Sequence, residues 1–220
     1  MPTPVTPRRS ELSILLAALL GALALSAIRP YDRPTWVMEV APIFVGVPLL
    51  IATARRFPLT PLLYRLIFLH AVILMVGGHY TYARVPLGFW AQELFGFTRN
   101  HYDRLGHFAQ GFVPAMIARE ILLRRTPLRP GGWLFFLVAS VALAISACYE
   151  FVEWWAALAG GEAATDFLGT QGDVWDTQWD MFLALIGACS AQWLLARRHD
   201  RELAQLSGAG SLTDGPPPAG

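Results

Sequence analysis

Apolar residues fall into long runs along this chain, and short polar segments that carry most of the charged residues separate them. A helix that crosses a bilayer core of about 30 Å needs roughly 20 apolar residues, with about 17 as the practical minimum. Six stretches reach or approach that length, so the pattern predicts six membrane-spanning helices. The stretches are Leu12–Ile28, Val37–Ala54, Leu62–Tyr80, Arg104–Leu123, Trp133–Leu158 and Asp176–Ala196.

Between the third and fourth stretches, residues 84–99 carry apolar side chains at helical spacing. A short amphipathic helix of this kind lies in the plane of the membrane interface rather than across the bilayer. The pattern therefore predicts a short interfacial helix. Its apolar positions are Leu87, Trp90, Leu94 and Phe95.

The composition agrees with a membrane protein. Hydrophobic residues make up 55% of the chain and charged residues 15%, against about 25% charged residues in a typical soluble domain. The net charge of +1 gives no electrostatic reason to expect a nucleic-acid partner. The two cysteines, Cys148 and Cys189, lie inside apolar stretches and form no disulfide framework. We expect an all-α, polytopic protein whose main partner is the lipid bilayer.

The arginines orient the predicted helices. Loops on the cytoplasmic side of a membrane carry the excess of basic residues, and all 17 basic residues of this chain are arginine. With the N-terminus inside, twelve arginines fall on the inner side and five on the outer side. We therefore predict cytoplasmic termini, with a cytoplasmic segment at 1–11, a six-helix transmembrane domain at 12–198 and a disordered cytoplasmic tail at 199–220.

The first stretch has an alternative interpretation. Arg8 and Arg9 before an apolar run, followed by the small residues Ala24 and Ser26, also fit a signal peptide with its cleavage site. The apolar run is long for a signal peptide, and its removal would leave an odd number of helices. We expect the first helix to be retained.

Three of the predicted helices each carry a stripe of polar residues at spacings that place them on one helix face. With the predicted topology, all three stripes lie near the outer ends of their helices. The stripes are Asp103, His107 and Gln110; Glu150 and Glu153; and Asp173, Asp176 and Asp180.

We therefore predict one polar site near the outer leaflet, built from acids and a histidine. A lone acid at the centre of a membrane helix costs about 2.5–3.5 kcal/mol, and a group of acids also repels itself unless protons, basic side chains or a cation neutralise it. The candidate catalytic residues are His107, Glu150, Glu153, Asp176 and Asp180, the candidate metal ligands are His107, Glu150, Asp176 and Asp180, and the rim is formed by His79, His101, Asp103, Arg104 and Asp173.

Carboxylates and imidazoles in this arrangement suit a divalent metal ion such as Zn²⁺ or Mn²⁺, and they suit a proton relay equally well. The chain contains no HExxH, no GxSxG and no phosphate-binding glycine loop. Simpler roles also exist, since Asp103, Asp173 and Asp176 stand where acids cap the positive ends of helices. Capping does not account for Glu150 or Asp180.

Three strings of the sequence stand out: NHYDRLGHF at 100–108 with Gly111-Phe112; Tyr149-Glu150 with Glu153-Trp154; and Asp173, Asp176-Thr177-Gln178 and Asp180-Met181. Together they resemble the YjdF-type family of bacterial inner-membrane proteins, over roughly residues 12–198. The resemblance implies an inner-membrane location and a helical architecture, and it implies no reaction. A fainter similarity exists to VanZ-like membrane proteins, which usually carry Asn where this chain has Asp180. The positions concerned are Asp103, Arg104, His107, Phe108, Glu150, Asp176 and Asp180.

Three classes of function remain open. The first is a metal-dependent membrane enzyme that acts on lipid or envelope precursors. The second is a small transporter or proton-coupled permease, which is disfavoured because the inner half offers no polar partner beyond Gln110. The third is a non-catalytic protein whose charge network holds the bundle together.

Overall fold

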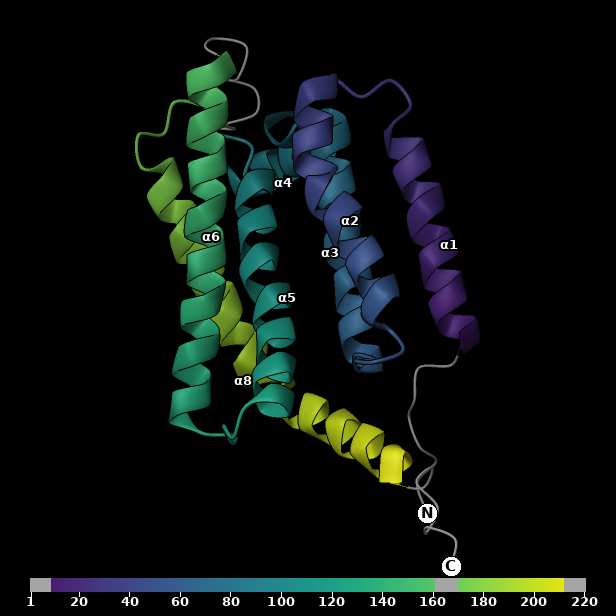
Figure 1. Ribbon diagram of the computed structural model, residues 1–220. Coiled ribbons are helices and arrows are strands. Elements are labelled where there is room, and N and C mark those ends of the chain that lie inside the picture. The colour runs from purple at the N-terminus through teal and green to yellow at the C-terminus, as the bar shows by residue number, and fades with distance from the viewer. Residues whose placement is uncertain (1–8, 161–169, 212–220) are drawn as a thin grey trace, which may run out of the picture.

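The computed structural model describes residues 9–160 and 170–211, and these residues form helices and connecting loops without a β-strand. Long helices run side by side, with α1, α2 and α3 in one group and α5, α6 and α8 in the other (Figure 1). α5 joins the two groups, because it packs against α3 on one side and against α6 and α8 on the other. The elements are α1 (Arg9–Ser26), α2 (Arg33–Thr53), α3 (Pro61–Tyr80), η1 (Tyr82–Arg84), α4 (Pro86–Phe95), α5 (Tyr102–Arg125), α6 (Gly132–Gly160) and α8 (Asp176–Ser211).

Five of the described helices are long and apolar enough to cross a membrane: α1, α2, α3, α6 and α8. This supports the prediction of an all-helical polytopic protein. α5 is long enough at 24 residues, but its charged side chains make it less apolar than those five helices. Most of its polar residues are buried among the neighbouring helices α3, α6 and α8, which is why this helix tolerates its charges.

Local signals in the sequence set the helix starts. Asp32 caps α2 by accepting a hydrogen bond of 2.8 Å from the backbone N–H of Thr35, which satisfies one of the free donors of the first turn. Proline stands in the first turn of α2, α3 and α4, where its missing N–H costs nothing. The predicted short helix in residues 84–99 is present as α4, and it ends at Gly96, whose φ of 67° is in the left-handed region.

α5 and α8 pack with their backbones in close contact. A methyl group added at Gly111 of α5 would overlap the carbonyl oxygen of Ala184, and one added at Gly187 of α8 would overlap that of Phe108. Glycine is therefore required at both positions for this approach. The close packing fixes the relative register of the two helices that carry most of the predicted site.

A cluster of buried polar side chains joins α5, α8 and the start of α3. These helix segments meet at the lower end of the bundle (Figure 1). The carboxylate of Glu120 on α5 accepts hydrogen bonds from the backbone N–H and the hydroxyl of Thr60 and contacts Nε2 of His199 at 2.9 Å. Glu202 on α8 accepts a hydrogen bond of 2.8 Å from the N–H of Leu62. Two carboxylates thus neutralise the positive end of α3.

α8 extends far beyond the predicted sixth stretch. Its 36 residues would measure roughly 54 Å at 1.5 Å per residue, and Figure 1 shows its last part running across the lower end of the bundle. The prediction of a disordered tail from residue 199 is therefore wrong for residues 199–211. The physical reason is that His199 and Glu202 are buried against α5 and α3, so this charged segment has a surface on which to fold.

Candidate functional site

His107 lies at the centre of the predicted site, in the second turn of α5. Its Nε2 lies 3.5 Å from Asp103 Oδ1 and 3.9 Å from Asp180 Oδ2, and its Nδ1 lies 3.7 Å from Glu150 Oε1. All four side chains are buried, with exposed fractions between 2% and 11%. Residues from α5, α6 and α8 therefore converge on one imidazole, as the stripes in the sequence predict.

Two sets of three possible metal ligands share this histidine. Asp103, His107 and Asp180 form one, and His107, Glu150 and Glu153 form the other, with the ligand atoms of each set within 4.8 Å of one another. Nδ1 of His107 lies 3.0 Å from Oε1 of Gln110. Because an amide oxygen only accepts, Nδ1 donates this bond, and in the neutral ring Nε2 then keeps its lone pair. The geometry thus favours the set with Asp103 and Asp180, which face Nε2.

The acids of the site have few hydrogen-bond donors. Three buried carboxylate oxygens have no hydrogen-bond partner within residues 9–160 and 170–211. They are Oε1 and Oε2 of Glu150 and Oδ1 of Asp180. Buried carboxylates are normally paired, because leaving a buried acceptor without a donor costs free energy. Oxygen atoms left without donors around one imidazole are the chemistry that a bound cation satisfies.

A cavity of about 160 Å³ adjoins His107 on the side of α2 and α3. Four of its polar groups were not predicted as part of the site: His70 on α3, Tyr82 in η1, Glu39 on α2 and Tyr149 on α6. The hydroxyl of Tyr149 donates a hydrogen bond of 3.2 Å to Glu39. The signal for Glu39 is present in the sequence, since it is the one acid within the second apolar stretch. The polar lining is Glu39, His70, Tyr82, Asp103, His107, Gln110, Tyr149 and Glu153.

Asp176 is separated from the metal-ligand sets by an ion pair. Its Oδ1 lies 2.7 Å from Nη2 of Arg99, a residue that was not predicted, and it is absent from both sets of possible ligands. The assignment of Asp176 as a candidate metal ligand therefore loses its support, whereas Asp103, predicted at the rim, occupies the centre. The reason is that Arg99, in the loop before α5, reaches across to α8.

Two of the remaining rim residues, Arg104 and Asp173, form an ion pair beside the site. Arg104 pairs with Asp173 at 3.0 Å, and its guanidinium lies over the ring of Trp179 at 5.1 Å. Its charge therefore neutralises Asp173 rather than the buried acids. His101 precedes α5 and packs its ring on Phe97. Burial, reinforced by the nearby Arg104 and Arg99, lowers the pKa of His101, which keeps its ring neutral at physiological pH.

His79 does not join the site. Its Nδ1 lies 2.9 Å from the backbone oxygen of Ser26 at the end of α1, and it is not among the residues that line the cavity. Depth along a helix can be inferred from the sequence, but a residue at the same depth can face another direction. From its glycine and acidic residues, we also expect the segment 160–173 between α6 and α8 to lie over the outer mouth of the site. Its residues 161–169 lie outside the described residues.

The expectation that the inner half has no polar partner beyond Gln110 is not met at the lower end of the bundle. Polar residues of the inner half do find partners, because Arg119 contacts His199 at 2.7 Å and Asp200 at 2.8 Å, next to buried Glu120. This second cluster was missed because its members come from the end of α5 and from the segment predicted to be disordered.

Comparisons with known proteins agree with the resemblance seen in the sequence. A family model described as "Predicted membrane protein (DUF2238)" matches residues 11–201. The chain is 62% identical over 181 residues to inner membrane protein YjdF of Escherichia coli (strain K12), which covers 82% of this chain and 87% of that protein. No solved structure shows a significant match.

Proposed function

Because the chain belongs to the DUF2238 family of predicted membrane proteins and is a multi-pass protein of the inner membrane, we propose that it is a membrane enzyme that uses a divalent cation bound by Asp103, His107 and Asp180. Its substrate class is a lipid or another envelope precursor. The observation that carries the proposal is the meeting of two carboxylates from two helices at Nε2 of one buried imidazole.

The balance of charge supports a cation at this position. Five acids line the site and its cavity, and His107 is the one basic side chain in hydrogen-bond or ion-pair reach of them among the described residues. Arg99 and Arg104, the nearest arginines, are paired with Asp176 and Asp173 instead. Several ionised carboxylates at this burial repel one another unless protons or a metal ion neutralise them. The acids are Glu39, Asp103, Glu150, Glu153 and Asp180.

A divalent ion in this position would supply known chemistry. It polarises a phosphoryl or carbonyl oxygen and lowers the pKa of a bound water, which makes a nucleophile at neutral pH. Glu150 lies on the Nδ1 side of His107, and Glu153 belongs to the same set of possible ligands, so both are available to exchange protons with a substrate. Residues of the three polar stripes thus supply both the metal ligands and the proton-exchanging groups.

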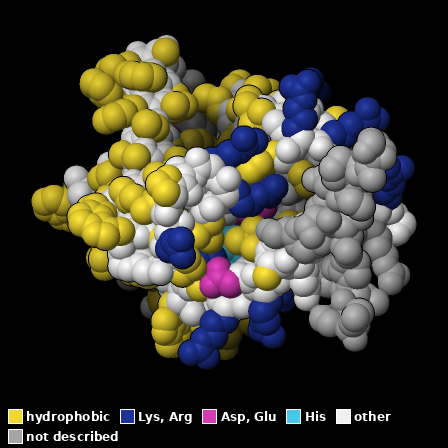
Figure 2. Space-filling view, turned by 60° about the horizontal axis from the view of Figure 1, so that its bottom comes forward, with side chains coloured by type: hydrophobic (Ala, Val, Ile, Leu, Met, Phe, Trp, Pro, Cys, Tyr) yellow, Lys and Arg dark blue, Asp and Glu magenta, His cyan; other side chains and the backbone are white. Residues whose placement is uncertain are grey.

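The position of the site in the bilayer supports a lipid-linked substrate. We infer that α5 is a sixth crossing helix, shielded from lipid by α3, α6 and α8, and that the lower end faces the cytoplasm. Figure 2 brings the lower end forward and shows basic side chains around it, as the positive-inside rule requires. His107 then lies near the outer leaflet, at the depth of lipid head groups.

The second polar cluster, around Glu120 and His199, is the one observation that favours a proton-coupled permease. A proton-coupled carrier needs polar groups on both sides of the membrane, and Glu120 with His199 provides them at the lower end. However, Glu120 is satisfied by Thr60, His199 and Arg124, so this cluster resembles a structural joint more than a transient binding site. We therefore keep the enzyme as the proposal.

Metal analysis tests the proposal directly. Protein purified in mild detergent, loaded with Zn²⁺ or Mn²⁺ and desalted, should retain about one ion per chain by elemental mass spectrometry. Asp180→Asn and His107→Gln should lose that ion while they elute as the wild type in size-exclusion chromatography. The control is Glu93→Gln, an exposed acid of α4, which should keep the metal.

Two outcomes would overturn the proposal. One is wild-type protein that retains no metal after loading; the other is equal metal content in Asp180→Asn and Glu93→Gln. If Asp180→Asn does not fold, Asp103→Asn removes the opposite ligand from another helix and replaces it in the comparison. If the wild type retains no metal and none of these site variants folds, the result favours a purely structural charge network.

A further inference from the structure

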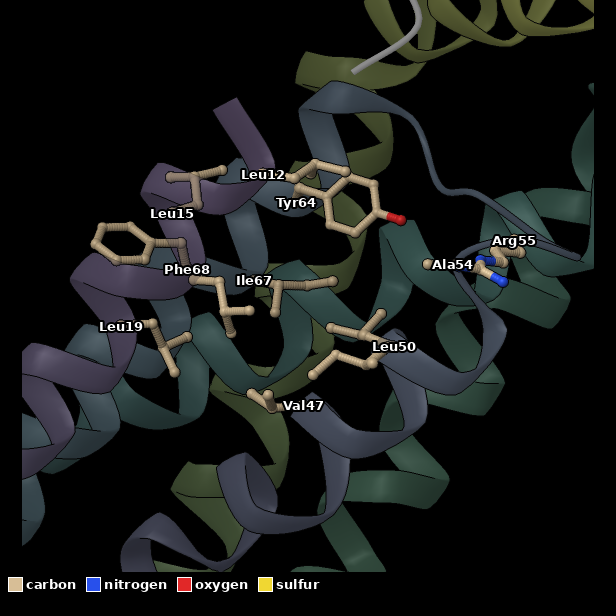
Figure 3. A pocket seen from close by; sticks show the side chains of 12 residues that line it. Leu12, Leu15, Leu19, Val47, Leu50, Ala54, Arg55, Tyr64, Ile67 and Phe68 are labelled. Carbon is tan, nitrogen blue, oxygen red and sulfur yellow. The ribbon is translucent and has the colours of Figure 1, made fainter. Parts of the chain in front are cut away.

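A second, apolar cavity lies between α1, α2 and α3, on the other side of the molecule from α6. Its volume is about 270 Å³. Figure 3 shows leucine, valine, isoleucine and phenylalanine side chains pointing into it, with Arg55 beside Ala54 at one end. We name this cavity the α1–α3 groove. Its lining residues are Leu12, Leu15, Leu16, Leu19, Val47, Leu50, Ile51, Ala54, Arg55, Tyr64, Ile67 and Phe68.

Two contacts attach α1 to the neighbouring helices beside the groove. Towards its upper end, Leu19 packs in a core cluster with Val40 of α2 and Met75 of α3. At its lower end, Glu11 and Arg65 form an ion pair of 2.7 Å. Between these two points, the leucines of α1 line an open space instead of interlocking with α2. The groove is thus part of the folded bundle.

The lower mouth of the groove is positively charged. Arg55 lines it, and Arg56 follows directly at the end of α2. Neither arginine forms an ion pair with an acid in the described part of the chain, and both are exposed. α1 begins at Arg9, so the positive end of this helix also points to the mouth. An anionic group is therefore favoured at this place.

We propose that the α1–α3 groove binds one acyl chain of an anionic phospholipid, with the phosphate of its head group at Arg55. A cavity of about 150 Å³ holds one benzene ring, so this groove accommodates a chain segment of roughly ten carbons. Basic pockets between helices at the cytoplasmic interface bind anionic head groups. The apolar lining accepts the chain, and the arginines select an anionic lipid over a zwitterionic one.

Native mass spectrometry of the full chain in mild detergent tests this binding. With equal amounts of phosphatidylglycerol and phosphatidylcholine of the same chain length, one phosphatidylglycerol adduct should persist. Val47→Trp fills the groove and should reduce that adduct at least tenfold. The matched control is Val45→Trp, because Val45 is 69% exposed on another face of the same helix.

The head-group contact and the acyl contact are separable. Arg55→Gln should reduce the preference for phosphatidylglycerol over phosphatidylcholine several-fold, with a phosphatidylcholine adduct retained. If Val47→Trp does not fold, Leu15→Trp blocks the groove from α1, and Ile14→Trp, 67% exposed, is its control. Equal adducts in the blocked and control variants, equal binding of the two lipids, or a dimer that replaces the lipid adduct would each overturn the proposal.

Discussion

Glu39 is 4% exposed in an apolar helix and accepts a hydrogen bond of 3.2 Å from Tyr149 on α6. This contact links the α1–α3 group of helices to the helices that carry His107. A carboxylate in this environment depends on its donors, because water does not replace them. At the residue scale, the cavity is therefore held together by contacts between a few polar atoms on different helices.

We expect Tyr149→Phe to destabilise the protein by about 1–3 kcal/mol, the usual cost of leaving a buried acceptor without a donor. In the Glu39→Gln background the same change should cost less, since a neutral amide tolerates the loss better. Thermal unfolding in detergent of the wild type, both single variants and the double variant measures this coupling. Tyr31→Phe, at an exposed position, is the control, and strictly additive effects would contradict the contact.

The sequence predicts the convergence of His107, Glu150 and Asp180 because helical spacing and a common depth are both readable from one chain. It does not predict that Asp176 binds Arg99, since that pairing depends on the path of the loop before α5. Glu39 was missed for a similar reason: a single acid forms no stripe, and its partner, Tyr149, is distant in the sequence.

At the scale of elements, the contact between α5 and α8 determines where the site residues lie. Asp103 and His107 stand on one helix and Asp180 on the other, and the close approach at Gly111 and Gly187 sets the distance between them. Side chains larger than hydrogen would separate the two helices and therefore the carboxylates. The small residues thus act on the site without touching it.

Gly111→Ala should destabilise the bundle by about 1–3 kcal/mol, because the added methyl group overlaps the backbone of α8. Gly46→Ala in α2 is the matched control: nothing lies within 4 Å of the new methyl group, so we expect no loss. The difference should appear as a melting temperature lower by several degrees for Gly111→Ala alone. Equal melting temperatures would show that the two helices do not pack this closely.

The helices themselves were largely predictable, and their ends less so. Runs of apolar residues identify α1, α2, α3 and α6 to within a few residues, because burial in lipid requires them. α8 was predicted too short, since the charged residues after Ala196 look like a solvated tail. Their folding depends on partners such as Glu120 and Leu62, which no local pattern reveals.

At the scale of the whole molecule, buried polar residues lie at two levels and an apolar layer separates them. Along α5, Met116 lies between Gln110 and Glu120, and it packs with Leu63 of α3 and Ala191 of α8. At the upper level, oxygens of Glu150 and Asp180 have no donor among the described residues, whereas at the lower level Glu120 is paired with Thr60 and His199. This asymmetry supports one chemical site near one surface and a structural joint near the other.

The orientation of the bundle decides which leaflet meets that site, and the arginines predict it. Twelve of them fall at the lower end and five at the upper end when the six stretches alternate, so both chain ends should be cytoplasmic. An alkaline phosphatase fusion after Arg201 should be inactive, and one inserted at Gly161 should be active, because this enzyme matures only in the periplasm. A green fluorescent protein fusion at the same two positions is the control and should give the reverse pattern. Active phosphatase after Arg201 would move His107 to the cytoplasmic leaflet, and the substrate would then have to reach the site from inside.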